Sequence, residues 1–386
     1  MVLPALPAGP AGALRVVVVG AGIGGLATAV ALRRAGHEVE VIERATALEE
    51  VGAGLSMAPN ALAALDRLGV GEELRRRGGV ARRILIRNRR GDVLSEIDAH
   101  GREWEVIGVH RADLQDVLVR AAAETDVRLG VACTGFTESS EAVAAILDDG
   151  SEVEGDLLVG ADGIRSAVRA RLDGDEPLRY AGYFGWRAVI DFDDPALRDT
   201  FTESWGPVFR VGLITIGRGR LYWFVSELAG EDAPLPDDPN AYFRDRLRDW
   251  HDPIPAVVAA TPRDTFSRLP IHDREPLKAW GRGRVTLLGD AAHPMTPNLG
   301  QGAAQALEDA IALADACSEA ADPIAGVRAY ERCRIPRTTM IVNRSRQLGR
   351  VAHLRNPVAC RLRDALMKAT PERVQRRQQE LVVGRI

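Results

Sequence analysis

The chain has few cysteines, very few lysines and no long apolar run, and each of these shortages excludes a class of protein. Cys133, Cys317, Cys333 and Cys360 are scattered without metal-ligand spacing, so we expect reduced thiols and neither disulfides nor a metal site. With two lysines and a net charge of −4, the chain lacks the basic field typical of nucleic-acid-binding proteins. No segment approaches twenty uncharged apolar residues, so we expect no transmembrane helix.

The N-terminal segment and the bulk composition point to an ordinary globular protein. Residues 1–14 contain three prolines and no basic segment, which favours a disordered extension over a signal peptide. We therefore expect a cytoplasmic protein. With 386 residues, of which 46% are hydrophobic and 27% charged, the chain is long enough for two or three domains.

Residues 15–44 predict a dinucleotide-binding unit of strand, glycine turn, helix, second strand and acid. After a run of four valines come glycines with G-x-G-x-x-G spacing, which permit a tight turn, close approach to a pyrophosphate and close packing of helix on strand. The helix start offers unpaired N–H groups to that pyrophosphate. An acid at the end of the second strand can accept both ribose hydroxyls and would repel a 2′-phosphate, so the ligand is FAD or NAD and not NADP. The candidate residues are Gly20, Gly22, Ile23, Gly25, Glu43 and Arg44.

Two further segments resemble parts of a ligand site in an α/β sheet. Residues 156–172 predict a buried strand, a turn and a helix, with Asp162 and Gly163 at the carboxyl end of the strand, where such sheets bind ligands. Glycines 52 and 54 predict a loop that passes close to a flat or charged group, and Gly54 is a candidate cofactor residue.

Residues 283–313 predict a third strand–turn–helix unit with an irregular loop before its helix. Two glycines flank a glutamine at the helix start, so several backbone N–H groups can face an anion there. Such an arrangement suits the N1–C2=O edge of a reduced flavin, which becomes anionic. The candidate cofactor residues of this unit are Gly289, Asp290, Gly300, Gln301 and Gly302.

Between these units, the alternating pattern of residues 180–269 predicts antiparallel strands. Four of the six tryptophans fall in this segment. Such a sheet is either a lid over a flat apolar ligand or an ordinary sheet with an aromatic core. A shorter hairpin is predicted at residues 84–97.

In combination, these motifs resemble the class A flavoprotein monooxygenases, the family of p-hydroxybenzoate hydroxylase. The resemblance covers about residues 15–345 and rests on GAGIGG at 20–25, ADGIRS at 161–166 and GDAAHPMTPNLGQG at 289–302. It is nearest to the salicylate hydroxylase-like, alkylquinolone monooxygenase and zeaxanthin epoxidase-like branches. It implies an α/β fold in which a Rossmann-like FAD-binding domain carries an inserted antiparallel β-sheet substrate domain and a C-terminal helical segment.

The resemblance also implies domain boundaries. The FAD-binding domain would be discontinuous, with residues 15–78, 104–179 and 275–345, and the substrate domain would combine residues 79–103 and 180–274. Residues 346–386 would form an arginine-rich helical tail whose basic face either contacts a membrane surface or is solvated. We expect a monomer or homodimer.

The resemblance assigns roles to several candidate residues. Glu43 would hold the adenosine ribose, Arg111 the pyrophosphate or ribityl region, and Asp290 the ribityl and phosphate portion. The loop from Pro297 to Gly302 would border the isoalloxazine ring. The Asp162-Gly163 pair is linked in the family to both FAD and the nicotinamide.

For catalysis, the resemblance directs attention to Arg210, Tyr222 and Pro297. Arg210 could pair with a substrate carboxylate, enolate or phenolate, although a surface arginine on an edge strand is an equally common arrangement. Arg187 has the same ambiguity, and Met295 is expected to line the substrate pocket. Two other residues near the loop are not expected to act as acid or base. His293 is expected to have a packing role, and Asn298 stands where some relatives carry an acidic residue, so a carboxylate base is absent there.

The activity that follows from the resemblance is NAD(P)H-dependent hydroxylation of an aromatic or quinolone-like small molecule through a flavin C4a-hydroperoxide. NADH or NADPH would visit transiently, because only one dinucleotide fold is present, and O2 would be the second co-substrate. The alternatives are epoxidation of an electron-rich alkene, a flavin reductase or dehydrogenase without oxygen insertion, and a non-catalytic FAD-binding regulator. A flavin-dependent halogenase is disfavoured, because no lysine precedes Lys278 and Trp186 is followed by Arg-Ala-Val.

Overall fold

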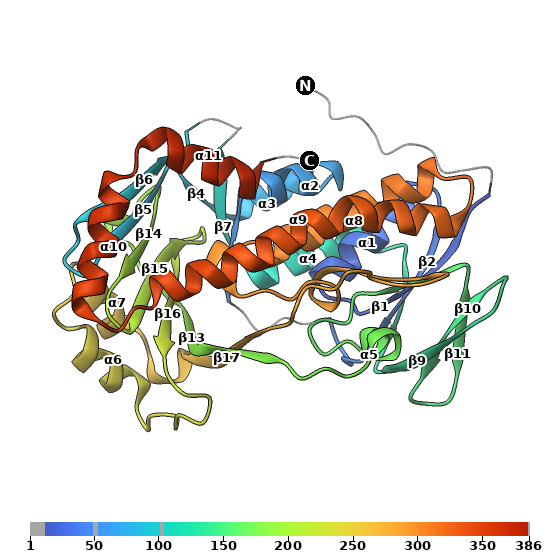
Figure 1. Ribbon diagram of the computed structural model, residues 1–386, viewed down its shortest axis with the longest axis horizontal. Coiled ribbons are helices and arrows are strands. Elements are labelled where there is room, and N and C mark those ends of the chain that lie inside the picture. The colour runs from blue at the N-terminus through green and yellow to red at the C-terminus, as the bar shows by residue number, and fades with distance from the viewer. Residues whose placement is uncertain (1–11, 49–52, 101–103, 385–386) are drawn as a thin grey trace.

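The computed structural model describes residues 12–48, 53–100 and 104–384, and shows two large sheets joined by helices (Figure 1). The predicted extension at 1–14 lies mostly outside these residues, as does Gly52 of the glycine loop. The predicted α/β class with an inserted antiparallel sheet and C-terminal helices is confirmed.

The first sheet is parallel and five-stranded, in the order β18-β12-β1-β2-β8. Its strands are β1 (Arg15–Val19), β2 (Glu38–Glu43), β8 (Asp126–Leu129), β12 (Leu157–Gly160) and β18 (Val285–Leu287). The valines of β1 are buried because layers cover both faces of the sheet, which explains their uninterrupted apolar run. This sheet brings together the turns after β1, β12 and β18.

Helices and a small antiparallel sheet cover the parallel sheet. Helix α1 (Ile23–Arg34) packs against α8 (Gly302–Glu319), and α8 packs against α9 (Pro323–Ala352). The small sheet of β9 (Cys133–Glu138), β10 (Val143–Leu147) and β11 (Glu152–Gly155) contacts β1 and β12. Helix α5 (Ala167–Asp173) follows β12 and contacts β9.

A second small sheet, in the order β3-β7-β4, lies between the two large sheets. Its strands are β3 (Gly54–Met57), β4 (Gly79–Ala81) and β7 (Val106–His110). Helices α2 (Pro59–Arg67) and α3 (Gly71–Arg77) connect β3 to β4, and α4 (Arg111–Ala121) follows β7. Because β4 and β7 also contact the large antiparallel sheet, this small sheet couples the two halves of the molecule.

The second large sheet has seven strands in the order β17-β13-β16-β15-β14-β5-β6. Only β14 and β5 pair in parallel. The strands are β5 (Arg83–Asn88), β6 (Val93–Asp98), β13 (Arg179–Asp191), β14 (Thr200–Trp205), β15 (Phe209–Thr215), β16 (Arg220–Leu228) and β17 (Ser267–Asp273). The predicted hairpin at 84–97 is β5–β6, whereas the sequence pattern does not indicate β14 and β17 as separate strands.

The two faces of this sheet differ because successive side chains alternate between them. Helices α6 (Pro239–Leu247) and α7 (Ile254–Ala260) cover the outer face, where Trp186, Trp223 and Phe243 pack in an apolar core. The inner face carries Arg187, Arg210 and Tyr222, and looks toward the parallel sheet. The outer face thus has the aromatic core of the second sequence-based interpretation, and the inner face lines a cavity.

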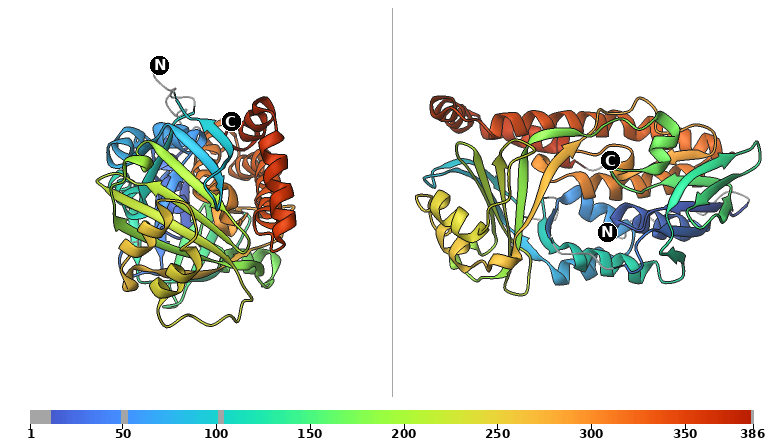
Figure 2. Two further views of the ribbon diagram at one scale, coloured as in Figure 1. Left: turned by 90° about the vertical axis from the view of Figure 1, so that its left-hand side faces the viewer. Right: turned by 90° about the horizontal axis from the view of Figure 1, so that it is seen from below.

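The C-terminal helices complete the structure. Helix α9 runs along the long axis from the parallel sheet toward the seven-stranded sheet (Figures 1 and 2). It is followed by α10 (Pro357–Ala369), which packs along β6, and by α11 (Glu372–Val383). The boundary expected between residues 345 and 346 falls inside α9, since this helix continues to Ala352. In the part of the chain that the structure describes, no helix combines the length and apolar character needed to cross a membrane.

His353 attaches the end of α9 to the seven-stranded sheet. Its ring stacks on that of Tyr183 with a centroid separation of 4.3 Å, and its Nδ1 hydrogen-bonds the Gly349 carbonyl. The Nε2 atom is buried without a partner. Desolvation, reinforced by the charge of Arg210, lowers the pKa of His353 from 6.5 to about 3.

We expect the His353→Phe variant to lose part of the acid sensitivity of the fold. Below pH 6.5 the unfolded chain binds a proton that the folded chain does not, so this histidine lowers the free energy of unfolding by up to about 1.4 kcal/mol per pH unit. Above pH 6.5 it has no such effect. Urea unfolding at pH 7, 6 and 5 would measure the slope, with His100→Phe, an exposed histidine, as control. An unchanged slope in His353→Phe would contradict this account.

Candidate functional site

A single cavity of about 990 Å³ gathers most of the predicted site residues between the two large sheets. It is bordered by the turns of the parallel sheet, the strand β3, the loop before α8 and the inner face of the seven-stranded sheet. The predicted residues that line it are Gly22, Ile23, Gly54, Arg111, Gly163, Arg187, Arg210, Tyr222, Gly289, Asp290, Met295, Pro297, Gly300, Gln301 and Gly302. Five others lie outside its lining: Gly20, Gly25, Glu43, Arg44 and Asp162.

Each of the three glycines in the first turn is required for a different structural reason. Gly20 has φ +103°, and a Cβ atom there would lie 2.5 Å from the Ala161 carbonyl oxygen. A Cβ at Gly25 would overlap the carbonyl oxygen of Gly20. At Gly22, by contrast, a Cβ would meet nothing within 4 Å and would project into open space. The turn therefore leaves room for a ligand at Gly22, and the uncapped start of α1 offers N–H groups beside it.

The acids of the two flanking turns are partly engaged by backbone groups. The Glu43 carboxylate accepts hydrogen bonds from the N–H groups of Ala21 (2.7 Å) and Ala45 (2.8 Å), which fixes its orientation at the end of β2. The Asp162 Oδ2 accepts from Ala167 N–H (2.7 Å) at the start of α5, while Oδ1 is buried without a partner. Desolvation raises the pKa of Asp162. In this structure Asp162 thus supports the turn, and its neighbour Gly163 lines the cavity.

Asp290 lies at the floor of the cavity beside a basic group. Its carboxyl is accessible from the cavity but otherwise surrounded by protein, and desolvation raises its pKa against the opposing charges of His293 and Arg111. Arg111 opens α4, with its backbone N–H donated to the Ala53 carbonyl (2.8 Å). The pair provides one acceptor and one donor for a polar ligand that carries both hydroxyl and phosphate groups.

The loop at 296–302 is held by α9. Thr296 Oγ1 and Ser345 Oγ are 2.9 Å apart, and Asn298 Nδ2 donates to the Ser345 carbonyl (2.9 Å). Gly300 adopts the left-handed conformation with φ 62°, next to Ser56 of β3. The Oε1 atom of Gln301 accepts hydrogen bonds from Asn60 Nδ2 (2.9 Å) and Gln305 Nε2 (3.0 Å), so this oxygen is already engaged by the protein.

A buried ionic network lies behind this loop. Arg334 of α9 donates to Asp309 and Glu308 of α8, at 2.6 Å each, and all three side chains are almost inaccessible. Asp309 also accepts from the Gly289 N–H (3.1 Å) and bonds His293 Nε2 (2.6 Å). Burial acts to raise the pKa of Asp309, but the charges and hydrogen bonds of His293 and Arg334 lower it. His293 therefore has a packing and hydrogen-bonding position, away from the cavity lining.

Arg210 is buried on β15, an interior strand of the sheet. Its Nε donates to Glu203 Oε1 on the adjacent strand β14 (2.6 Å), and its Nη1 donates to Asn298 Oδ1. Tyr183 also donates its hydroxyl to Asn298 Oδ1, at 3.2 Å. Arg210 is therefore not a surface arginine on an edge strand, and Glu203 already balances its charge.

Arg187 and Tyr222 form a second polar group on the same inner face. Tyr222 packs against Gly54, where a Cβ atom would overlap its ring, and burial raises the pKa of its hydroxyl. The positive charge of Arg187 opposes this rise, so the two side chains are close enough to interact. Within the described part of the chain, Arg187 has no carboxylate partner, in contrast to Arg210.

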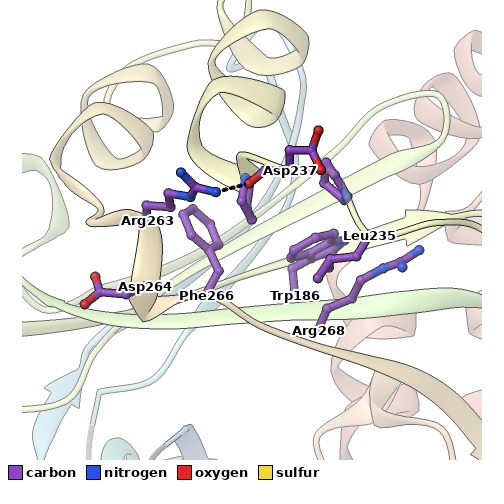
Figure 3. Close-up of a pocket in the computed structure, with 9 residues that line it drawn as sticks. Trp186, Leu235, Asp237, Arg263, Asp264, Phe266 and Arg268 are labelled. Carbon is purple, nitrogen blue, oxygen red and sulfur yellow. Dashed lines mark hydrogen bonds between the residues drawn. The ribbon is translucent and has the colours of Figure 1, made fainter.

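A smaller hollow of about 610 Å³ lies on the outer face of the sheet (Figure 3). It is lined by Trp186, Phe266 and Arg268, and Arg263 donates to the Asp237 carbonyl at its rim. The Arg268 guanidinium lies 3.5 Å from the Phe184 ring centroid. Because the sheet separates this hollow from the main cavity, none of the predicted cofactor residues lines it.

Sequence reasoning missed the residues that hold the polar groups of the inner face. The sequence motifs indicate neither Glu203 nor Tyr183, and they mark Asn298 only as the absence of an acid. No local pattern reveals the Glu203 contact, because it depends on β14 pairing with β15. Strand alternation places Glu203 and Arg210 on the same face only once β14 is known to be a strand beside β15.

Comparison with known proteins identifies relatives along nearly the whole chain. A family model described as "FAD binding domain" matches residues 13–345. Aurachin C monooxygenase/isomerase of Stigmatella aurantiaca is 42% identical over 359 residues, which cover 92% of this chain and 94% of that protein. The FAD-dependent urate hydroxylase of Klebsiella pneumoniae is 35% identical over 357 residues, covering 88% of this chain and 91% of that protein. A crystal structure of Klebsiella pneumoniae HpxO with FAD and uric acid has a TM-score of 0.88 at 32% identity, covering 96% of each chain.

The glycine geometry predicts different defects for two alanine substitutions. Gly22→Ala should fold with nearly unchanged stability but bind FAD at least tenfold more weakly, because its methyl group would enter the ligand space. Gly25→Ala should lower the free energy of unfolding by several kcal/mol, because its methyl group would overlap a backbone carbonyl. Thermal unfolding of the FAD-free proteins and FAD titration separate the two effects. Equal stability losses in both variants would refute this distinction.

Proposed function

This chain belongs to the class A flavoprotein monooxygenases, and from this membership we propose that it uses NADH or NADPH, O2 and bound FAD to hydroxylate an aromatic or quinolone-like small molecule. The observation that carries the proposal is the shared cavity. Residues suited to the cofactor line the same space as Arg187, which has no carboxylate partner among the described residues. Oxygen activated on a bound flavin would therefore be released into the space that also holds the substrate.

The residues around the first part of the cavity fit FAD. The open space at Gly22 and the start of α1 suit the pyrophosphate, with Arg111 nearby. Glu43, outside the cavity lining at the end of β2, would hold the adenosine ribose. Asp290 would hold the ribityl chain. The backbone of residues 300–302 would border the isoalloxazine ring, where N–H groups stabilise negative charge.

The division of labour between cofactor and protein follows from the chemistry. When bound and reduced by NAD(P)H, which docks only transiently, the flavin supplies activated oxygen, one atom of which goes to the substrate and one to water. The side chains of this chain orient the substrate and exclude water. Pro297 and Met295 provide apolar walls to the cavity, which favour a dry reaction space.

Substrate orientation is assigned to the inner face of the seven-stranded sheet. Arg187 is available to pair with an anionic or enolic oxygen of the substrate, and the Tyr222 hydroxyl, which has no hydrogen bond among the described residues, can donate to the same oxygen. Arg210, already paired with Glu203, would hold Asn298 and the cavity wall in position and contact the substrate through its remaining donors.

The proposed reaction predicts substrate-stimulated NAD(P)H oxidation coupled to oxygen insertion. Purified protein reconstituted with FAD should oxidise NADH or NADPH faster with a suitable hydroxyaromatic or 4-hydroxyquinoline compound, and the product should gain 16 daltons. Mass detection with ¹⁸O2 checks the source of the oxygen. Stimulated oxidation that yields only hydrogen peroxide, whatever the aromatic compound, would instead support a reductase.

Two substitutions should distinguish residues that bind the cofactor from residues that bind the substrate. We expect Asp290→Ala to lose most of its FAD. Arg187→Gln should keep FAD but raise KM at least tenfold, because a charge-assisted hydrogen bond is worth about 1.5–3 kcal/mol. Arg268→Gln, on the outer face of the same sheet, is the matched control and should leave KM unchanged. Equal KM values for the two arginine variants would remove Arg187 from the substrate site.

A further inference from the structure

The cavity extends well beyond the groups that suit the flavin and the substrate head. It continues across the seven-stranded sheet to the β5–β6 hairpin, in which β6 is the edge strand, and residues of α10 and α11 line its opposite wall. We call this part the arm. Its lining residues are Ile84, Leu85, Ile86, Ser95, Ile97, Met367, Gln375, Gln378, Gln379, Val382 and Val383.

None of these lining residues is charged, whereas the charged residues that line the rest of the cavity are Arg111, Arg187, Glu203, Arg210, Asp290 and Arg344. Its sheet wall consists mainly of isoleucines, and Ile84, Ile86 and Ile97 remain only partly buried. A concave wall of uncovered apolar side chains is favourable only when an apolar group covers it. The polar side chains of the opposite wall are neutral glutamines.

The length of the arm excludes a simple aromatic acid as its occupant. A head held by Arg187 on β13 would lie over the two strand spacings from β13 to β15, about 10 Å, and three further spacings, about 14 Å, separate β15 from β6. An extended chain of about ten methylene groups spans a similar distance, at roughly 1.3 Å per carbon–carbon bond along the chain. A single aromatic ring held by Arg187 would leave the arm empty.

Helix α11 closes the arm through few contacts. Gln375 pairs with Ser95 on β6, Arg376 stacks over Trp104 at 5.3 Å, and Arg337 of α9 donates to the Val382 carbonyl (3.2 Å). Of its residues only Val382 is buried. A helix attached this way can separate from the sheet at low cost, which gives a long apolar group a route into the arm.

We propose that the substrate carries an apolar chain, attached to its aromatic or enolic head, which lies in the arm between the β5–β6 edge and α10–α11. The inference rests on the proposed function, because it specifies the substrate class of the same site. Head and chain have separate determinants: charge near Arg187, and apolar contact at Ile86, Ile97 and Met367.

Binding of graded probes to the FAD-loaded protein tests the inference directly. We would titrate 4-hydroxyquinoline and its 2-alkyl and 3-alkyl derivatives, with chains of one to twelve carbons, and follow the flavin absorbance. The affinity should rise by up to about fourfold per methylene and level off near ten carbons. Affinity that is independent of chain length in both series, or no binding of any probe, would overturn the inference.

Adjacent residues of β6 provide a matched pair of variants. Ile97→Trp points into the arm and should abolish the chain-length dependence, while affinity for unsubstituted 4-hydroxyquinoline and FAD content stay unchanged. Glu96→Trp points to the other face and should behave as wild type. Met367→Trp fills the arm from α10 and gives an independent test if Ile97→Trp does not fold. Persisting chain-length dependence in a folded arm-filling variant would overturn the inference.

Product analysis with the same probes separates this inference from the proposed function. Chain-dependent binding without any oxygenated product would contradict the monooxygenase proposal alone. Oxygenation of short and long probes with equal KM would support the monooxygenase proposal and overturn the inference that the arm binds an apolar chain. Higher kcat/KM for long probes, lost in Ile97→Trp and kept in Glu96→Trp, is the result expected when both hold.

Discussion

The buried contact between Arg334 and the pair Asp309 and Glu308 is the constraint on which the site depends. It joins α9 to α8 at their middle, and through Asp309 it reaches the Gly289 backbone and His293. A buried charge that loses its partner costs about 3–5 kcal/mol. This network therefore fixes the positions of α8, α9 and the turn after β18 relative to one another. The loop at 296–302 is bonded to Ser345 of α9, so its position is fixed as well.

Local sequence signals are enough to predict some parts of the molecule, whereas other parts depend on contacts between distant segments. The unit at 15–44 could be predicted because its turn, helix and acid are neighbours in the chain, and the backbone alone requires Gly20 and Gly25. The inserted sheet could be predicted only in part. β14 and β17 have weak alternation of their own, and pairing with β15 and β13 makes them strands.

The site shows the same limit. Cofactor candidates from three separate segments converge because each follows a strand of one parallel sheet, whose carboxyl ends share an edge. The partners of Arg210 could not be foreseen, since Glu203 and Asn298 come from a neighbouring strand and from the loop held by α9. Likewise, nothing in the composition of α11 reveals that it covers the β5–β6 edge, because that contact is a property of the whole fold.

The two faces of the seven-stranded sheet have different roles: the outer face stabilises the fold, and the inner face lines the cavity. The outer face packs its aromatic residues under α6 and α7, and this core supplies the folding free energy of the sheet. The inner face contributes less to that core, because a cavity lies over it. Substitutions at its partly exposed positions, such as Ile86 and Ile97, consequently cost less stability than substitutions in the outer core. A fold of this kind can acquire new substrates through changes on one surface while its cofactor turns and its core stay constant.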